Sequence, residues 1–329
     1  MKTSKTITRA FCVELQRELS ITAARREYFS LEPPRQRFEF LCSSEACRAL
    51  GAKITGVRYD VKPQDNPTFV AAHFRANPHY AHDPGCEWVD NDAEAAPAPL
   101  NESEGEARLR KARRKLDDYI DVFDPTLRAP DKDKEKPKAP ATGAEAKPAP
   151  TPTIERSLAS SAATTAMRSE TRSSNLERLV DAYRQAKAQL TPEDFNLLKL
   201  RVSGQGELTL RSYFRHIKYA QLGDNGRIVY GGGLVERYGA GFKFKFFDRL
   251  NGKLVTLYVS PAQMQAYRSS RYISELLSHA DEVKFFTVYA LGTLEESPSG
   301  KSISVKVDDL RHLAIVLGPA KTPGQTVPV

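Results

Sequence analysis

The last hundred residues of the chain contain several short runs in which apolar and polar side chains alternate, and this pattern constrains the fold most strongly. In the run 242–247 (FKFKFF), phenylalanines alternate with Lys243 and Lys245, as expected for a strand with one buried face and one basic face. The runs 227–237 (RIVYGGGLVER) and 254–259 (LVTLYV) have the composition of neighbouring strands. An Asn-Gly step at 251–252 predicts a hairpin turn between the second and third strands.

A helix and further strands follow along the chain. Ser260 is a predicted N-cap and Pro261 a predicted first helical residue, and apolar residues recur at helical spacing as far as Ala280. Strands are then predicted at 283–291 and 302–307, and a closing segment is predicted at 310–317. The helix is expected to cover one end of the sheet formed by these strands.

This order of five strands, with a helix after the third, resembles the OB-fold family. The resemblance implies a small barrel over residues 221–318 and a ligand on the face of the second and third strands. Residues 319–329 are expected to form a flexible tail. Members of the family bind single-stranded nucleic acids, but OB barrels also bind sugars and proteins, so the ligand has to be argued from the residues themselves.

The basic and aromatic residues of the predicted strands indicate a surface for nucleic acid. Lysine and arginine side chains would contact phosphates, and tyrosine rings would stack on bases. The residues predicted to make these contacts are Tyr230, Arg237, Tyr238, Lys243, Lys245, Arg249 and Tyr258. Tyrosines are also common in strands that bind nothing, and such a groove stacks the bases of DNA and RNA alike. We expect weakly specific binding to nucleic acid, with single strands favoured.

Cysteine spacing is the second informative pattern of the chain. Cys42 and Cys47 follow a predicted strand, and His82 and Cys86 come about 35 residues later, a spacing typical of structural Zn2+ sites with three thiolates and one imidazole. His73 and His79 are alternatives for the fourth ligand, whereas Cys12 lies in an apolar context and is a predicted buried thiol. Four protein ligands leave no open position for a catalytic water, so the predicted zinc is structural.

The segments FLCSSEACRALGAKI and AAHFRANPHYAHDPGC, which contain these ligands, are similar to the N-terminal zinc-binding segment of competence CoiA-like proteins. The first cysteine pair is separated by four residues here, whereas two is common in that family. The resemblance implies a zinc-binding domain over residues 1–92. Members of the family also have a nuclease domain, and no comparable nuclease core is found in this sequence.

Two changes in composition separate these regions. Residues 104–123 have the pattern of an amphipathic basic helix, which is interpreted either as a phosphate-contacting helix or as a solvated face docked on the zinc domain. Residues 125–174 are rich in Pro, Ala, Lys, Ser and Thr, and we expect a disordered linker that lets the two ends act semi-independently. A helical extension is predicted at 175–220, and it is also a candidate surface for a protein partner. The predicted fold class is therefore α+β and multidomain, with a zinc-stabilised N-terminal domain, a disordered linker and a C-terminal five-stranded OB-type β-barrel.

Overall charge agrees with a polyanionic partner. The chain has 329 residues, with 49 Lys and Arg against 41 Asp and Glu, so its formal net charge is +8. A basic balance of this kind favours nucleic acid without identifying it. No apolar run is long enough to cross a membrane, and the first residues lack the apolar core of a signal peptide, so we expect a cytoplasmic protein without a membrane partner.

No catalytic signature is recognised in the sequence. The glycines at 231–233 lie inside a predicted strand and do not precede a helix, which is unlike a P-loop or a dinucleotide fingerprint. No catalytic residue is predicted, and an enzyme is the less favoured interpretation. Two other functions stay open: a protein-binding adaptor of a bacterial mobile element or phage-defence system, and a nucleic-acid enzyme with an unrecognised acidic site.

Overall fold

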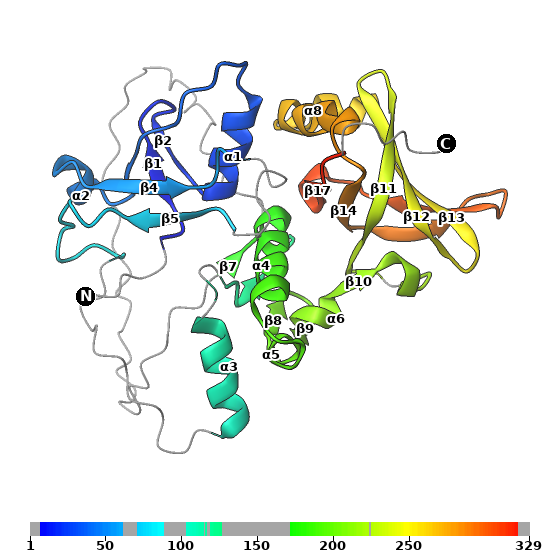
Figure 1. Cartoon of the computed structure of the whole chain (residues 1–329), viewed down its shortest axis with the longest axis horizontal. Coiled ribbons are helices and arrows are strands. Elements are labelled where there is room, and N and C mark those ends of the chain that lie inside the picture. The colour runs from blue at the N-terminus through cyan, green and yellow to red at the C-terminus, as the bar shows by residue number, and fades with distance from the viewer. Residues whose placement is uncertain are drawn as a thin grey trace, which may run out of the picture.

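A computed structural model describes residues 7–61, 71–88, 103–114, 116, 119–126, 172–223 and 225–321. The described chain is a mixed α+β protein with sheets of five, eight and four strands (Figure 1). Residues 127–171 of the predicted linker and 322–329 of the predicted tail lie outside the described residues. Within the described part, no helix has both the length and the apolarity needed to span a membrane.

The N-terminal sheet has the strand order β2-β1-β3-β4-β5, and each neighbouring pair is antiparallel. Its strands are β1 (Ala10–Cys12), β2 (Arg17–Leu19), β3 (Phe40–Cys42), β4 (Lys53–Val57) and β5 (His73–Ala76), and its helices are α1 (Ile21–Ser30) and α2 (Glu45–Ala49). Helix α1 begins at Ser20, whose side chain accepts a hydrogen bond from the Ala23 amide. The sheet and α1 enclose a small core that includes Phe40, Phe74 and Trp88. We refer to this unit as the N-terminal module.

The middle of the chain contains strands as well as helices. Its elements are α3 (Glu104–Arg114), β6 (Val122–Phe123), β7 (Arg172–Ser173), α4 (Leu176–Gln189), α5 (Pro192–Leu197), β8 (Lys199–Val202), β9 (Gly206–Thr209), α6 (Leu210–Tyr213), β10 (Phe214–His216) and the 3-10 turn η2 (Ile217–Tyr219). The predicted helix 104–123 therefore ends earlier than expected, because Val122 and Phe123 pair with β8 in a four-stranded sheet. The predicted helical extension 175–220 likewise contains three strands that periodicity alone does not reveal.

The C-terminal sheet contains the predicted strands and also β15 (Thr293–Glu296), a strand that the sequence did not predict. Strands β11 (Ile228–Tyr238), β12 (Gly241–Leu250) and β13 (Lys253–Val259) form an antiparallel meander, and β14 (Phe286–Leu291), β15 (Thr293–Glu296), β16 (Ser302–Lys306) and β17 (Leu313–Leu317) follow. The strand order is β15-β16-β13-β12-β11-β14-β17, with β10 added beside β11. The rings of Phe242, Phe244 and Phe246 lie in the core, as the alternating pattern predicts.

None of the sheets of the described chain closes into a barrel. The predicted five-stranded barrel is therefore wrong in this respect, because the two end strands of the C-terminal sheet do not pair with each other. The two ends of the strand path are β15 and β17. Strands β14 and β15 are nevertheless separated by Gly292 alone, and they pair with β11 and β16 respectively. A Cβ atom at Gly292 would lie 2.1 Å from the Lys306 carbonyl oxygen, so this close approach requires glycine.

The predicted helix after the third strand is divided into α7 (Pro261–Ala266) and α8 (Ser270–Ser278). Ser260 caps α7 in a capping box with Gln263, which confirms the predicted start. Tyr267 then takes an extended backbone conformation and packs against the core, so it ends the first helix. Met264, Ile273 and Leu277 cover the interior of the C-terminal sheet.

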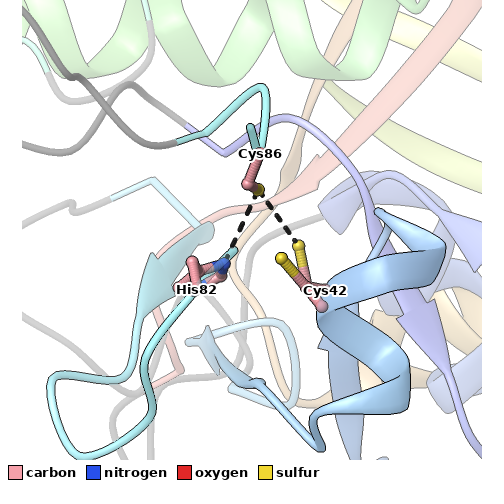
Figure 2. A group of neighbouring side chains, drawn as sticks. Cys42, His82 and Cys86 are labelled. Atoms are coloured by element: carbon pink, nitrogen blue, oxygen red, sulfur yellow. Dashed lines mark hydrogen bonds between the residues drawn. The ribbon is translucent and has the colours of Figure 1, made fainter. Parts of the chain in front are cut away.

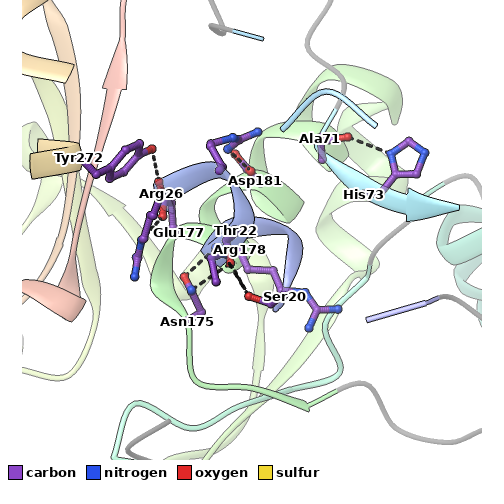
Figure 3. Close-up of polar contacts among 12 residues, drawn as sticks. Ser20, Thr22, Arg26, Ala71, His73, Asn175, Glu177, Arg178, Asp181 and Tyr272 are labelled. Atoms are coloured by element: carbon purple, nitrogen blue, oxygen red, sulfur yellow. Dashed lines mark hydrogen bonds and ion pairs between the residues drawn. The ribbon is translucent and has the colours of Figure 1, made fainter. Parts of the chain in front are cut away.

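The N-terminal module is docked on the C-terminal part through α1. Phe29 on α1 belongs to the core of the C-terminal sheet, and the Arg25 and Arg26 side chains form ion pairs with Asp181 and Glu177 on α4. Figure 3 shows that the Tyr272 hydroxyl on α8 also donates to Glu177. The two ends of the chain are therefore packed together here, which differs from the semi-independence expected from the linker composition.

Candidate metal centre and nucleic-acid interface

Two separate segments bring Cys42, Cys47, His82 and Cys86 together at the edge of the N-terminal module. Cys42 is the last residue of β3, Cys47 lies in α2, and the other two residues lie in the loop after β5. One ligand atom from each residue lies within 4.8 Å of the other three. All three cysteine side chains are buried. Figure 2 shows the Cys42, His82 and Cys86 side chains converging from these segments.

The spacing of the donor atoms fits a four-coordinate metal ion. A tetrahedral ion with metal–sulfur bonds of ~2.3 Å has sulfur–sulfur edges of roughly 3.8 Å. The Cys42 and Cys86 Sγ atoms lie 3.6 Å apart, and the Cys86 Sγ atom lies 3.7 Å from His82 Nδ1. This sulfur–sulfur distance is too long for a disulfide, and all four cysteines of the chain are free. The residues therefore form a possible metal site.

Burial gives the cluster its electrostatic character. It raises the pKa of the Cys42 thiol to about 12 and lowers the pKa of the His82 imidazole, because a low-dielectric environment disfavours both charged forms. A divalent cation reverses this preference for the thiols, since it binds thiolates and a neutral imidazole. The Asp83 amide donates a hydrogen bond to Cys47 Sγ over 3.2 Å and ties the loop after β5 to α2.

The structure decides between the candidate histidines. His73 lies on β5 and its Nδ1 atom hydrogen-bonds with the Ala71 carbonyl over 3.1 Å (Figure 3). His79 is exposed in the loop after β5, and neither histidine joins the cluster. Cys12 is fully buried, with its Sγ atom 3.4 Å from a Glu14 carboxylate oxygen, and it is a core thiol as predicted.

The C-terminal sheet brings four of the predicted contact residues onto one surface. Lys243 pairs with Tyr258 and with Glu236 across the antiparallel strands, so these side chains share the face opposite the phenylalanine core. Lys245 and Tyr238 both contact the Glu236 carboxylate on the same face. We call this surface of β11–β13 the outer face. Tyr238 and Tyr258 are each 49% exposed on it.

The other three predicted residues lie outside this cluster of exposed side chains. The Tyr230 hydroxyl accepts a hydrogen bond from Tyr183, and its ring stacks on Tyr289, so it is partly covered by the middle of the chain. Arg237 pairs with a core residue, Phe242, and donates to the Ser274 carbonyl of α8. Arg249 follows a register shift in β12 and donates to the carbonyl of the hairpin glycine at 252.

Two contact candidates on the outer face were missed by sequence reasoning. Leu234 and Phe247 are 44% and 55% exposed, and Phe247 follows Lys243 and Lys245 on the outward side of β12. A Cβ atom at Gly232 would lie 3.3 Å from the Phe247 ring, so this glycine lets the ring approach β11 closely. The doubled Phe at 246–247 was the available signal, since strict alternation allows only one of them to be buried.

Comparisons with family models, with curated proteins and with solved structures find no match to this chain. The resemblances to OB-folds and to CoiA-like proteins therefore stay predictions based on the residues quoted above. Function has to be inferred from the metal cluster and the outer face.

Proposed function

We propose that the protein binds nucleic acid, with single strands favoured, through the outer face of β11–β13. The observation that carries the proposal is the combination of exposed aromatic rings with lysines on one rigid sheet surface. Tyr238, Phe247 and Tyr258 are each about half exposed, and Lys243 and Lys245 lie between them on β12. Large apolar side chains that stay exposed together usually mark a binding surface.

The chemistry of this surface suits an unpaired strand better than a duplex. Aromatic rings stack on bases whose faces are accessible, and each stacked base contributes about 1–3 kcal/mol. Lysines contact the phosphates and displace the counterions bound to them. This release is less favourable at higher salt concentration, so the affinity should fall as salt rises. Glu236 pairs with Lys245 and reduces the positive charge of the face, which agrees with modest and weakly specific affinity.

We further propose that the C-terminal sheet is of the OB type. The meander β11–β13, the parallel pairing of β13 with β16, and the helices between β13 and β14 agree with that strand order. The segment 286–296 pairs with β11 through β14 and with β16 through β15, on either side of Gly292. In OB-folds the face of the second and third strands is where oligonucleotides bind, and β12 and β13 occupy those places.

The metal that we propose for the cluster is Zn2+ in a structural role. Three buried sulfur atoms and one imidazole are the donor set that zinc prefers, and together they would fill all four positions of a tetrahedral ion. Bound zinc would supply cross-linking of the loop 81–88 to β3 and α2, not a reactive water. The His82 Nε2 atom is buried without a hydrogen-bond partner among the described residues. A metal-bound histidine is usually oriented by a hydrogen bond from its second ring nitrogen, so His82 is the ligand whose orientation the protein fixes least.

Fluorescence anisotropy with labelled oligothymidylate and a matched duplex, at two salt concentrations, tests the nucleic-acid proposal. We expect a salt-sensitive preference for the single strand and a loss of at least fivefold in affinity on Tyr258→Ala, the value of about one stacked base. Tyr80→Ala is a matched control, because Tyr80 is an exposed tyrosine of the N-terminal module. Absence of binding to every nucleic acid at low salt would refute the proposal and favour the adaptor function.

A further inference from the structure

The outer face continues past Phe247 to a second group of aromatic and basic residues. Along β11, side chains on the outer face come from alternate residues, so Tyr230 follows Gly232 on the same side of the sheet. The His216 ring lies edge-to-face with Tyr230 at 5.1 Å between centroids. Tyr219, on η2, is 64% exposed and lies 6.1 Å from His216 by the same measure.

This second group is held rigidly by the fold. Strand β10 pairs in parallel with β11, which places His216 opposite Tyr230. Ile217, the first residue of η2, is fully buried in the core of the C-terminal sheet. The Lys218 amide donates to His216 Nδ1 over 3.3 Å, which fixes the turn. Tyr219 is therefore an exposed ring on an anchored turn, not the tip of a long loop.

Charge at this end of the face also suits a polyanion. The Lys218 ammonium lies 5.8 Å from the Tyr219 ring. Asp248 is the nearby acidic residue, and its carboxylate lies 3.8 Å from His216 Nε2. Lys218 thus brings a permanent positive charge beside the exposed Tyr219 ring, while the Asp248 carboxylate faces His216.

We infer that His216, Lys218 and Tyr219 form a second subsite for the same single-stranded nucleic acid that binds the outer face. This inference rests on the proposed function and adds the length of strand that the site accommodates. Tyr230 and Tyr238 are eight residues apart on β11, which corresponds to ~26 Å at ~3.3 Å per residue. A stacked strand with ~3.4 Å per nucleotide covers this distance with about eight nucleotides. An oligonucleotide of four nucleotides fills only one end of the track, whereas one of twelve reaches Tyr219.

Anisotropy titrations of the full chain with labelled dT4 and dT12 test the second subsite. We expect Tyr219→Ala to weaken dT12 binding by roughly 5- to 150-fold, the range for one stacked base, and to leave dT4 binding unchanged. Tyr258→Ala is expected to weaken both, and Tyr219→Phe to restore dT12 binding because it keeps the ring. Circular dichroism of each variant confirms that the exposed substitutions leave the fold intact.

The possible results separate the two proposals. Equal dT12 affinity for the wild type and Tyr219→Ala, with Tyr258→Ala still weakened, would overturn the second subsite and leave the proposed function standing. An equal loss for dT4 and dT12 on Tyr219→Ala would also overturn it, because the ring would then act at the main face. Failure of the wild-type protein to bind either length would overturn both.

Discussion

Replacing Asp181 by leucine should loosen the N-terminal module from the rest of the chain. Arg25 Nη1 on α1 lies 2.8 Å from Asp181 Oδ2 on α4, and both side chains are only 8% exposed. Removing one partner of a buried ion pair leaves an uncompensated charge and typically costs 3–5 kcal/mol. Glu177 also faces Arg25, so we expect a loss in unfolding free energy near the lower value, about 3 kcal/mol.

The pair can be tested by a double-mutant cycle. Arg25→Met combined with Asp181→Leu replaces both charges by apolar side chains of similar size and should restore stability to within about 1 kcal/mol of the wild type. The exposed pair of Lys199 and Glu207, at 52% and 53% side-chain exposure, is the matched control. Glu207→Gln should cost at most about 1 kcal/mol.

Tryptophan fluorescence during urea unfolding is a suitable assay. Trp88 is the single tryptophan of the chain, and it lies in the core of the N-terminal module with its indole N–H donating to Ser43. Its emission therefore reports unfolding of the module itself. If Asp181→Leu shifts the urea midpoint no more than Glu207→Gln does, the buried ion pair between Arg25 and Asp181 does not stabilise the protein in solution, and the reasoning is refuted.

Three further outcomes are expected. Cys86→Ser should reduce bound zinc from about one ion per chain to near zero and lower the midpoint of unfolding, whereas Cys12→Ser should keep the ion, as measured by plasma mass spectrometry. Gly233→Ala should destabilise the protein by about 1–3 kcal/mol in thermal melts, since its Cβ would lie 2.6 Å from a backbone carbonyl oxygen of β12. Gly105→Ala is the control: a Cβ at this position of α3 would meet no atom within 4 Å, and the change should stabilise the protein by ~0.5–1 kcal/mol. The hydrogen bond from Lys245 lowers the pKa of the Glu236 carboxyl, so this negative charge persists at neutral pH and is lost only as pH falls below the ordinary range. Glu236→Gln at neutral pH should therefore tighten single-strand binding by about threefold in anisotropy titrations, and an unchanged affinity would show that this carboxylate does not face the ligand.

Local sequence patterns determined the elements that depend on near neighbours. The alternation of Phe242, Phe244 and Phe246 with lysines predicted which face of β12 is buried, because successive side chains of a strand point to opposite sides. Ser260 and Pro261 predicted the start of a helix, because an N-cap acts within the first turn. The Cys/His spacing predicted a metal cluster, and the grouping of the four residues agrees with it.

Only the tertiary structure decided which residues of similar local character share a surface. Phe247 is 55% exposed on the lysine side of β12, whereas Tyr230 is covered because α4 and β14 pack beside it. His82 joins the cysteines while His73 bonds to the backbone, a choice made by the path of the loop after β5. Arg25 forms an ion pair with Asp181, which lies 156 residues further along the chain. Such contacts depend on the packing of segments that are distant in the chain, and helical or strand periodicity contains no information about that packing.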